Sequence, residues 1–547
     1  SKTLPLFIAA LMVFPPVYLN VLEGVRCTDA SLLEMARVFR VPFSRTLRGI
    51  YLPQVLPYFR SAVSTALGLL WGLHCGYKKG GVLDKLSTTF QIVVNTMPSF
   101  VIALVLMILF CFRQRWFPYT GLNSAGVVPG TAGYLWDRIR HLILPVLTLT
   151  IAAAPSRYLL MRNTVRQVTE EKYVLYAKER GLSDHKIKFG YILKNIAQPF
   201  ITMVGMSVST CIGGSLVVEN IFSIGGMGRL LSDAVYAGLS ADAGHPVRYN
   251  GHHDRFHCCD GCDLYFDRSQ SSVGRWSGMK KRCVPLALGG ILLFFFLVAA
   301  VFPAAFTSYG QKEMFVPWLT PSPAHLLGTN ALGYDIFTEL VYGTRQTLLI
   351  GVSSSVLTLV LGSVIGTLAA GKSVVGGVLN GVINIFVLLP KLVTMIVLAT
   401  FLGSSSRNLI LLIAAFSWVG TARNVRAKVI HLNAQPFIEN CVIQGYSHGH
   451  IVLHHIIPNL YDVLLSRFLL GVNSCIMMES TLSFLGFGDL YYPTWGTMIN
   501  FAYKRGAFLR QAYEYLLSPG VCIMLLSLSF YLISLYFEHR QATIQYI

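Results

Sequence analysis

Histidines and cysteines cluster between residues 247 and 266, where Cys259 and Cys262 have the spacing of a zinc-ligand pair. A second pair at a matching distance is missing, so the cluster alone does not define a zinc site. Translated one nucleotide out of frame, the same segment becomes an apolar run of about 17–20 residues, long enough to span a membrane. We favour a local frameshift over a metal site or an ordinary loop. The potential ligands are His252, His253, His257, Cys258, Cys259 and Cys262.

Residues Gly366 to Ser373, with the sequence GTLAAGKS, satisfy the pattern of a phosphate-binding loop. Such a loop requires a strand before it and a helix after it in a soluble domain. An apolar run precedes it here, so we interpret the glycines as close-packing positions of a membrane span that ends at Lys372. His454 and His455 are adjacent and do not share a helix face, so we expect no metal site there.

Glu219 and Glu479 lie in long apolar stretches, and an acid inside a membrane is a candidate functional residue. They are 260 residues apart, and a serine and two glycines recur after each at the same separation. This recurrence indicates an internal duplication. Because both acids lie near helix ends, we expect a structural or gating role rather than contact with a substrate. The two sets are Glu219, Ser223, Gly226 and Gly228, and Glu479, Ser483, Gly486 and Gly488.

The composition places these residues in a membrane protein. The 547 residues are 54% hydrophobic and only 13% charged, with a mean hydropathy of +0.56. Soluble domains carry about 25% charged residues, so we expect an all-α, polytopic helical bundle. The net charge of +19 lies in short loops, which favours cytoplasmic membrane loops over nucleic-acid binding. No catalytic triad or carboxylate pair is visible in a soluble context, so we expect no catalytic residue, cofactor or bound metal.

Apolar runs predict the membrane spans. The segment from Arg157 to Lys194 carries nine Lys and Arg residues against four acids, and 423–455 is also basic, so both are expected in the cytoplasm. The polar stretch 308–344 is expected outside. The span 406–420 is short for a full crossing. The predicted spans are 3–20, 57–76, 88–112, 140–161, 197–222, 284–307, 345–371, 377–403, 406–420, 458–487 and 516–537.

Both basic loops contain a second repeated element. It consists of a helix, a glycine, a short amphipathic helix and a proline near the return to the membrane. The copies are YVLYAKERGLSDHKIKFGYILKNIAQP and FIENCVIQGYSHGHIVLHHIIPN. A glycine permits the sharp turn between two short helices. Such a helix could anchor at the membrane interface or dock a soluble partner.

This pattern resembles the EAA loop of ABC-importer permeases, and the flanking segments resemble the peptide/nickel group of that family. The segments LVVENIFSIGGMGRLLSDAV and HLILPVLTL are similar to its first permease, and AHLLGTNALGYDIFTELVYGTRQTLLIG and ESTLSFLGFGDLYYPTWGTMI to its second. The family's usual alanines are replaced by Leu175 and Tyr176, and by Asn440 and Cys441, so coupling strength could differ. The resemblance implies two type I permease halves, at 73–240 and 282–547. It assigns ATPase coupling to the loops that contain Ala177, Gly181, Leu182, Glu439, Gly445 and Tyr446.

The resemblance further implies an importer subunit in the bacterial cytoplasmic membrane for peptides or nickel, driven by separate ATPase subunits and supplied by an extracytoplasmic solute-binding protein. Residues 1–72 instead resemble the C-terminal part of a nitrate/sulfonate/taurine-type permease, with a third EAA-type loop in which Arg40 occupies the glycine position. Residues 241–281 form an aberrant linker. A fused, non-functional chimera and an ATP-independent carrier therefore stay open as alternatives.

Overall fold

The computed structural model describes residues 67–124, 132–196, 216–224 and 279–544, apart from positions 79, 194, 372 and 390. The histidine–cysteine cluster, residues 1–66, Gly226, Gly228 and Lys372 lie outside the described residues. The regular secondary structure of the described residues is helical, apart from two isolated β-bridges, Met314–Tyr334 and Thr329–Asp335. The prediction of an all-α protein is therefore confirmed.

The chain divides into two compact units, with the division near residue 275. In the first unit, a helix at 67–77 is followed by α5 (Val82–Asn95), α6 (Ser99–Met107) and the π-helix η2 (Ile108–Arg113). The axes of the α5 and α6 segments differ by 102°. Pro98 lies directly before α6, where a proline favours a break in a helix. The remaining helices are α7 (Ala132–Glu170), α8 (Lys172–Glu179), α9 (Asp184–Lys186), η3 (Ile187–Ile192) and α11 (Leu216–Ile221).

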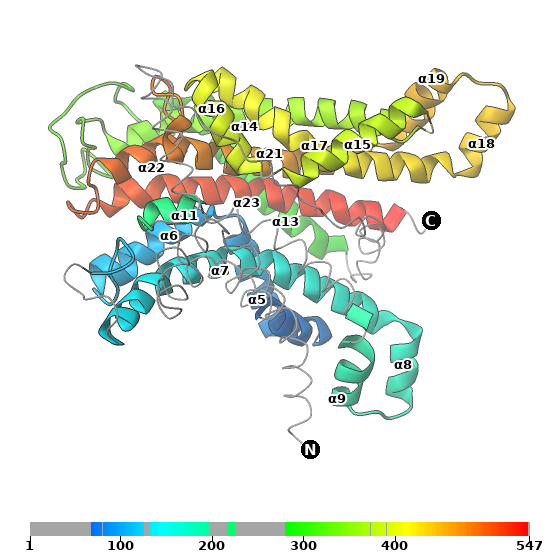
Figure 1. The fold of residues 1–547 in the computed structure, drawn as a ribbon. Coiled ribbons are helices and arrows are strands. Elements are labelled where there is room, and N and C mark those ends of the chain that lie inside the picture. The colour runs from blue at the N-terminus through cyan, green and yellow to red at the C-terminus, as the bar shows by residue number, and fades with distance from the viewer. Residues whose placement is uncertain are drawn as a thin grey trace, which may run out of the picture. The chain divides into compact units, whose positions relative to one another are not determined.

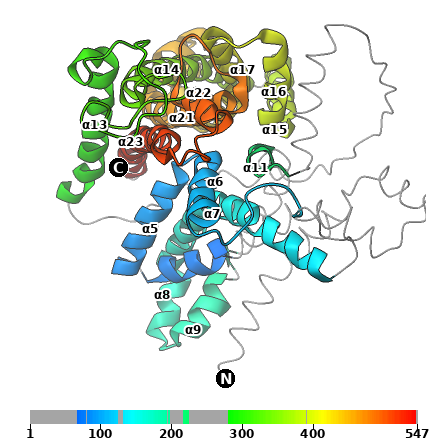
Figure 2. The same cartoon turned by 90° about the vertical axis from the view of Figure 1, so that its left-hand side faces the viewer.

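The second unit contains a bundle of long helices (Figures 1 and 2). Helix α14 packs against α17 and α21, while α23 packs against α13, α21 and α22. The long helices are α13 (Met279–Val301), α14 (Ile336–Ala369), α17 (Ser406–Asn433), α21 (Tyr461–Leu482) and α23 (Tyr513–Ile544). The shorter ones are η4 (Pro303–Ala305), α15 (Val374–Leu388), α16 (Lys391–Leu402), α18 (Pro436–Ile443), α19 (His448–Ile451), η5 (Val452–Ile456), α20 (Ile457–Asn459), η6 (Ser483–Phe487) and α22 (Trp495–Lys504).

Six helices of the described part are long and apolar enough to cross a membrane, and two bent pairs bring the number to eight if each pair is one span. This confirms a polytopic membrane protein. One expectation was wrong: the span 406–420 is not too short for a full crossing, because these residues begin the 28-residue helix α17. Polar residues continue that helix past the apolar run, and Arg426 Nε donates to the Ala369 carbonyl at the end of α14, 3.2 Å away.

Close contacts hold α14 against α17. A Cβ atom added to Gly366 would lie 2.5 Å from the Ala422 carbonyl oxygen, so only glycine permits this approach of the two helices. The P-loop-like segment therefore begins inside a packed helix pair, as expected from its apolar context.

Helix 67–77 packs against α7 through the same kind of contact. The Cβ of a residue in place of Gly72 would meet the Met161 Cβ at 2.8 Å and the Tyr158 carbonyl at 3.1 Å, and that of Gly362 would meet Thr421 and the Trp418 carbonyl. Met161 and Thr421, like Tyr158 and Trp418, are 260 residues apart. The internal duplication inferred from Glu219 and Glu479 thus extends to the packing of the helices.

Candidate functional site

The first of the two loop elements, elbow 1 (residues 171–196), connects two antiparallel short helices through Gly181. Helix α8 ends just before this glycine, whose φ of +70° is a conformation that side chains rarely adopt. Nothing lies within 4 Å of a Cβ added there, so the position needs glycine for its backbone and not for space. Ser183 then caps α9, accepting a hydrogen bond from the Lys186 N–H at 3.4 Å.

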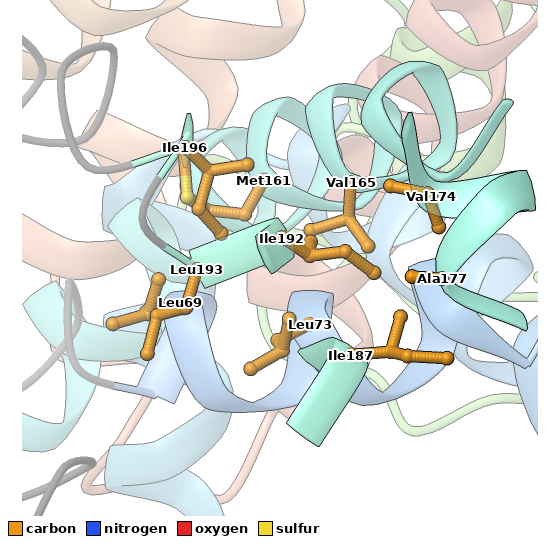
Figure 3. Close-up of a cluster of buried hydrophobic side chains, with 10 residues drawn as sticks. All are labelled: Leu69, Leu73, Met161, Val165, Val174, Ala177, Ile187, Ile192, Leu193 and Ile196. Atoms are coloured by element: carbon orange, nitrogen blue, oxygen red, sulfur yellow. The ribbon is translucent and has the colours of Figure 1, made fainter. Parts of the chain in front are cut away.

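A buried apolar cluster fixes elbow 1 to helix 67–77 and to the end of α7 (Figure 3). Ala177 is 3% exposed and belongs to this cluster, whereas Leu182 is half-buried against it. Ala177 therefore supports the elbow from inside, and other side chains form its surface. The cluster consists of Leu69, Leu73, Met161, Val165, Val174, Ala177, Ile187, Ile192, Leu193 and Ile196.

The second element, elbow 2 (residues 435–460), repeats this architecture. Helix α18 ends before Gly445, which has a φ of +81° and open space around its Cβ position. Ser447 caps α19 as Ser183 caps α9, and a π-helix follows in both elbows. Both glycines and both serines are 264 residues apart. Figure 1 shows α18 and α19, like α8 and α9, projecting from the end of a long helix.

The buried positions of the two elbows correspond at the same separation. Cys441, 9% exposed, takes the place of Ala177, and Ile451 takes the place of Ile187. The substitution of the family's alanine by Cys441 therefore keeps a small buried side chain at that position. The elbow 2 cluster consists of Val425, Val429, Leu432, Ile438, Cys441, Ile451, Ile456 and Leu460.

The exposed surfaces of the elbows differ. Elbow 1 exposes charged side chains, including Glu179, Arg180 and Lys186, beside Leu175 and Tyr176. Elbow 2 exposes Glu439 together with apolar and aromatic side chains, of which Ile443 is the most open at 77%. Its predicted site residue Tyr446 is 46% exposed, and its ring stacks on that of His450, which in turn stacks on that of His454, with ring centroids 4.9 and 4.2 Å apart.

Tyr77 holds elbow 1 in a way that the sequence did not reveal. Its hydroxyl donates to Asp184 Oδ1 at 2.5 Å, and the Lys188 and Lys178 ammonium groups lie 4.3 and 5.6 Å from the centre of its ring. Burial, together with the adjacent Asp184 carboxylate, raises the pKa of Tyr77 to about 12. Tyr77 therefore stays a neutral donor at neutral pH. The 107 residues between Tyr77 and Asp184 explain why spacing did not reveal the contact.

Glu479 lies at the other end of α21 from elbow 2. It is completely buried, and three hydroxyl groups donate to its carboxylate: Thr494 at 2.6 Å, Ser483 at 2.7 Å and Ser480 at 3.3 Å. The carboxylate thus joins α21 to the start of α22. This arrangement supports the structural role expected for the acid, because buried carboxylates need such donors.

The two glycines that follow Glu479 have different functions in the fold. Gly486 has a φ of +104° and turns the chain out of η6. A Cβ added to Gly488 would lie 2.1 Å from Thr497 Cγ2, so this glycine allows η6 and α22 to meet. Of the first set, Glu219 is half-buried in α11. Ser223 lies shortly after the end of this helix and has a φ of +51°.

A buried ion pair connects two helices of the first unit. Arg162 Nε donates to Asp84 Oδ1 at 2.5 Å and Arg162 Nη2 to Asp84 Oδ2 at 2.8 Å, with both residues buried. This bidentate contact joins α7 to the first turn of α5. Sequence reasoning missed it because 78 residues separate the partners.

A multi-pass helical protein with a duplicated, surface-projecting elbow after a long helix has the architecture of a transport permease. The chain belongs to the family described as binding-protein-dependent transport system inner membrane component, whose sequence model matches residues 2–73, 64–247 and 359–543. It is a multi-pass protein of the cytoplasmic membrane. The separate match to 2–73 is consistent with a third permease-like segment, and the nitrate-type assignment of that segment stays a prediction.

Peptide permeases are among its relatives. The dipeptide transport system permease protein DppC of Alkalihalophilus pseudofirmus is 32% identical over 251 residues, which are 45% of this chain and 81% of the relative. The protein of the same name from Bacillus subtilis is 30% identical over 41% of this chain and 71% of its own length. The oligopeptide transport system permease protein OppC of Mycobacterium bovis is 30% identical over 38% and 73%. Each of these relatives matches less than half of this chain.

Proposed function

We propose that this chain is the membrane-spanning subunit of an ATP-driven peptide importer, in which elbow 1 and elbow 2 each dock a separate ATP-hydrolysing subunit. The observation that carries the proposal is the duplicated elbow. The two copies share their buried positions but differ in their exposed side chains. Peptides are proposed rather than nickel because the relatives are named for dipeptides and oligopeptides. The family is binding-protein-dependent, which supports an extracytoplasmic binding protein as the further partner.

The chain's own contribution is mechanical. Each elbow is fixed by its buried cluster to the end of a long helix, α7 or α17, so a displacement of the elbow is transmitted to that helix. Helix α17 packs along α14, and α14 along α21. Closing of the ATPase subunits would then move these helices together and change access to the path for the peptide, while the chain itself carries out no chemistry.

Association with the ATPase subunits tests this proposal. We expect Ile443→Glu to lower co-purification of the co-expressed ATPase subunits at least tenfold, because it puts a charge on the apolar surface of elbow 2. Ile443 is 77% exposed, so the change leaves the core intact. Leu509→Glu is the matched control, since Leu509 is 80% exposed and lies beyond α22, at the opposite end of the second unit. Equal co-purification of both variants and the native chain would contradict the docking surface.

Transport separates this function from an ATP-independent carrier. In proteoliposomes that contain the chain, its ATPase subunits and its binding protein, peptide uptake should require ATP and should fall with Ile443→Glu. Uptake that follows an ion gradient and survives removal of the ATPase subunits would contradict the proposal.

A further inference from the structure

The recurring serine and glycines of the second unit form part of the wall of a cavity, and the recurring Glu479 lies behind this wall. The cavity has a volume of about 260 Å³, and Ser483, Gly486 and Gly488 line it together with residues of α22. The cavity opens beside the loop between η6 and α22, at the opposite end of α21 from elbow 2. The docking function of the elbows leaves this cavity unexplained.

Cations border the cavity on one side. Lys504 and Arg505, at the end of α22, line it and are exposed. The Arg505 guanidinium lies 4.9 Å from the centre of the Phe501 ring and also interacts electrostatically with the buried Glu339. Lys504 forms no ion pair with any residue that the structure describes, so no protein carboxylate competes with a ligand for it there.

The acid behind the wall does not compete for Lys504. The Glu479 carboxylate is enclosed by the hydroxyl groups of Ser480, Ser483 and Thr494 and is completely buried. Thr497, which also lines the cavity, is held by its hydrogen bonds with Thr494 at the start of α22. The polar wall is thereby fixed before any ligand enters.

We propose that this cavity is a binding site for a carboxylate group, with Lys504 as the principal cation and Arg505 at its border. The identification of the cargo as a peptide rests on the proposed function, and it offers two sources of this group: the C-terminal carboxylate of a peptide and an acidic side chain within it. Gly488 lets the two sides of the cavity wall meet, because a methyl group at this position would overlap Thr497 and Ser483.

Binding of short peptides to the full chain in nanodiscs tests the site without any ATPase subunit. The probes are trialanine, trialaninamide and the amidated peptide Ala-Asp-Ala, measured by titration calorimetry. We expect trialanine to bind about tenfold more tightly than trialaninamide, because only trialanine carries the C-terminal carboxylate that Lys504 would bind. Binding of amidated Ala-Asp-Ala comparable to that of trialanine would identify side-chain carboxylates as a second source.

Two variants assign the difference to the cavity. Lys504→Gln should bring the affinity for trialanine to that for trialaninamide, and Gly488→Ala should weaken carboxylate binding by displacing Thr497 and Ser483 in the cavity wall. Arg510→Gln is the control, because the Arg510 guanidinium lies over the Trp318 ring and does not line the cavity. Equal affinity for trialanine and its amide, no binding of any probe, or an unchanged difference in Lys504→Gln would each overturn the proposal. None of these outcomes depends on the elbows, so they are distinguishable from a failure of ATPase docking.

Discussion

At the scale of single residues, the elbow glycines show the clearest relation between sequence and function. Gly445 has a positive φ, whereas Gly449, four residues later, does not, and both have open space around the Cβ position. The two positions therefore differ in backbone conformation alone. This makes them a matched pair for testing whether the shape of elbow 2 matters.

We expect Gly445→Ala to destabilise elbow 2 by about 1 kcal/mol, the cost of a left-handed conformation for a residue with a side chain. Gly449→Ala should be neutral or slightly stabilising, because it lies within the short helix α19. Amide hydrogen exchange of residues 435–460 measures both effects. Equal exchange in the two variants would show that the turn at Gly445 does not determine the conformation of the elbow.

Tyr77 gives a prediction with a defined pH dependence. Its pKa of about 12 in the folded chain exceeds its ordinary value of 10.0, because burial and the adjacent Asp184 disfavour the tyrosinate. Its contribution is therefore complete below pH 10.0 and is lost as the pH rises toward 12. Tyr77→Phe should increase hydrogen exchange in elbow 1 by the same factor at all pH values near neutrality. A loss of the effect near neutral pH, far below the pKa of about 12, would contradict the role of the Tyr77 hydroxyl.

At the scale of helices, the two units differ in the contact between the long helix and the first helix of the bent pair, which is α5 in the first unit and α15 in the second. The sequence GGVLD at residues 80–84 recurs as GGVLN at residues 376–380, so Asn380 corresponds to Asp84. Ala422 stands 260 residues after Arg162. Both partners of the buried ion pair thus have neutral counterparts in the second unit.

This correspondence predicts non-additive effects on stability. Asp84→Asn alone should lower the free energy of unfolding by about 3–5 kcal/mol, because it leaves the buried Arg162 without its partner. Combining Asp84→Asn with Arg162→Ala, the residues found in the second unit, should recover part of this loss. A double-mutant cycle on thermal unfolding in detergent measures the coupling, and additive effects would show that the two residues act independently.

The limits of sequence reasoning also appear at this scale. The elbows could be anticipated because each is a local unit, in which a glycine and the spacing of apolar residues specify the turn and the buried face. Helix α17 was predicted too short because hydropathy decreases at Arg423, although the helix continues through a contact with α14. The Asp84–Arg162 and Tyr77–Asp184 contacts were not predicted, because periodicity carries no information about partners so far apart.

At the scale of the whole molecule, the duplication is the main result. The same separation of 260 residues relates Glu219 to Glu479 and the packing residues of α7 to those of α17. Each unit contains an elbow with the same buried positions. These relations support two permease halves in one chain, and the DNA sequence around residues 247–266 tests the proposed frameshift between them. Two compensating insertions or deletions relative to close relatives are expected there, and an uninterrupted frame shared with relatives that keep the cysteines would contradict it.

The central claim is that both elbows face the cytoplasm, where ATP-hydrolysing subunits are found. Single substitutions Ser183→Cys and Ser447→Cys place thiols on the exposed turns of the elbows, and Leu509→Cys places one at the opposite end of the second unit. Each is labelled with a membrane-impermeant maleimide in intact cells and in inverted vesicles, with the native chain as background. We expect the two elbow cysteines to react only in inverted vesicles and the cysteine at 509 only in intact cells. Labelling of either elbow from outside intact cells would contradict the proposed function.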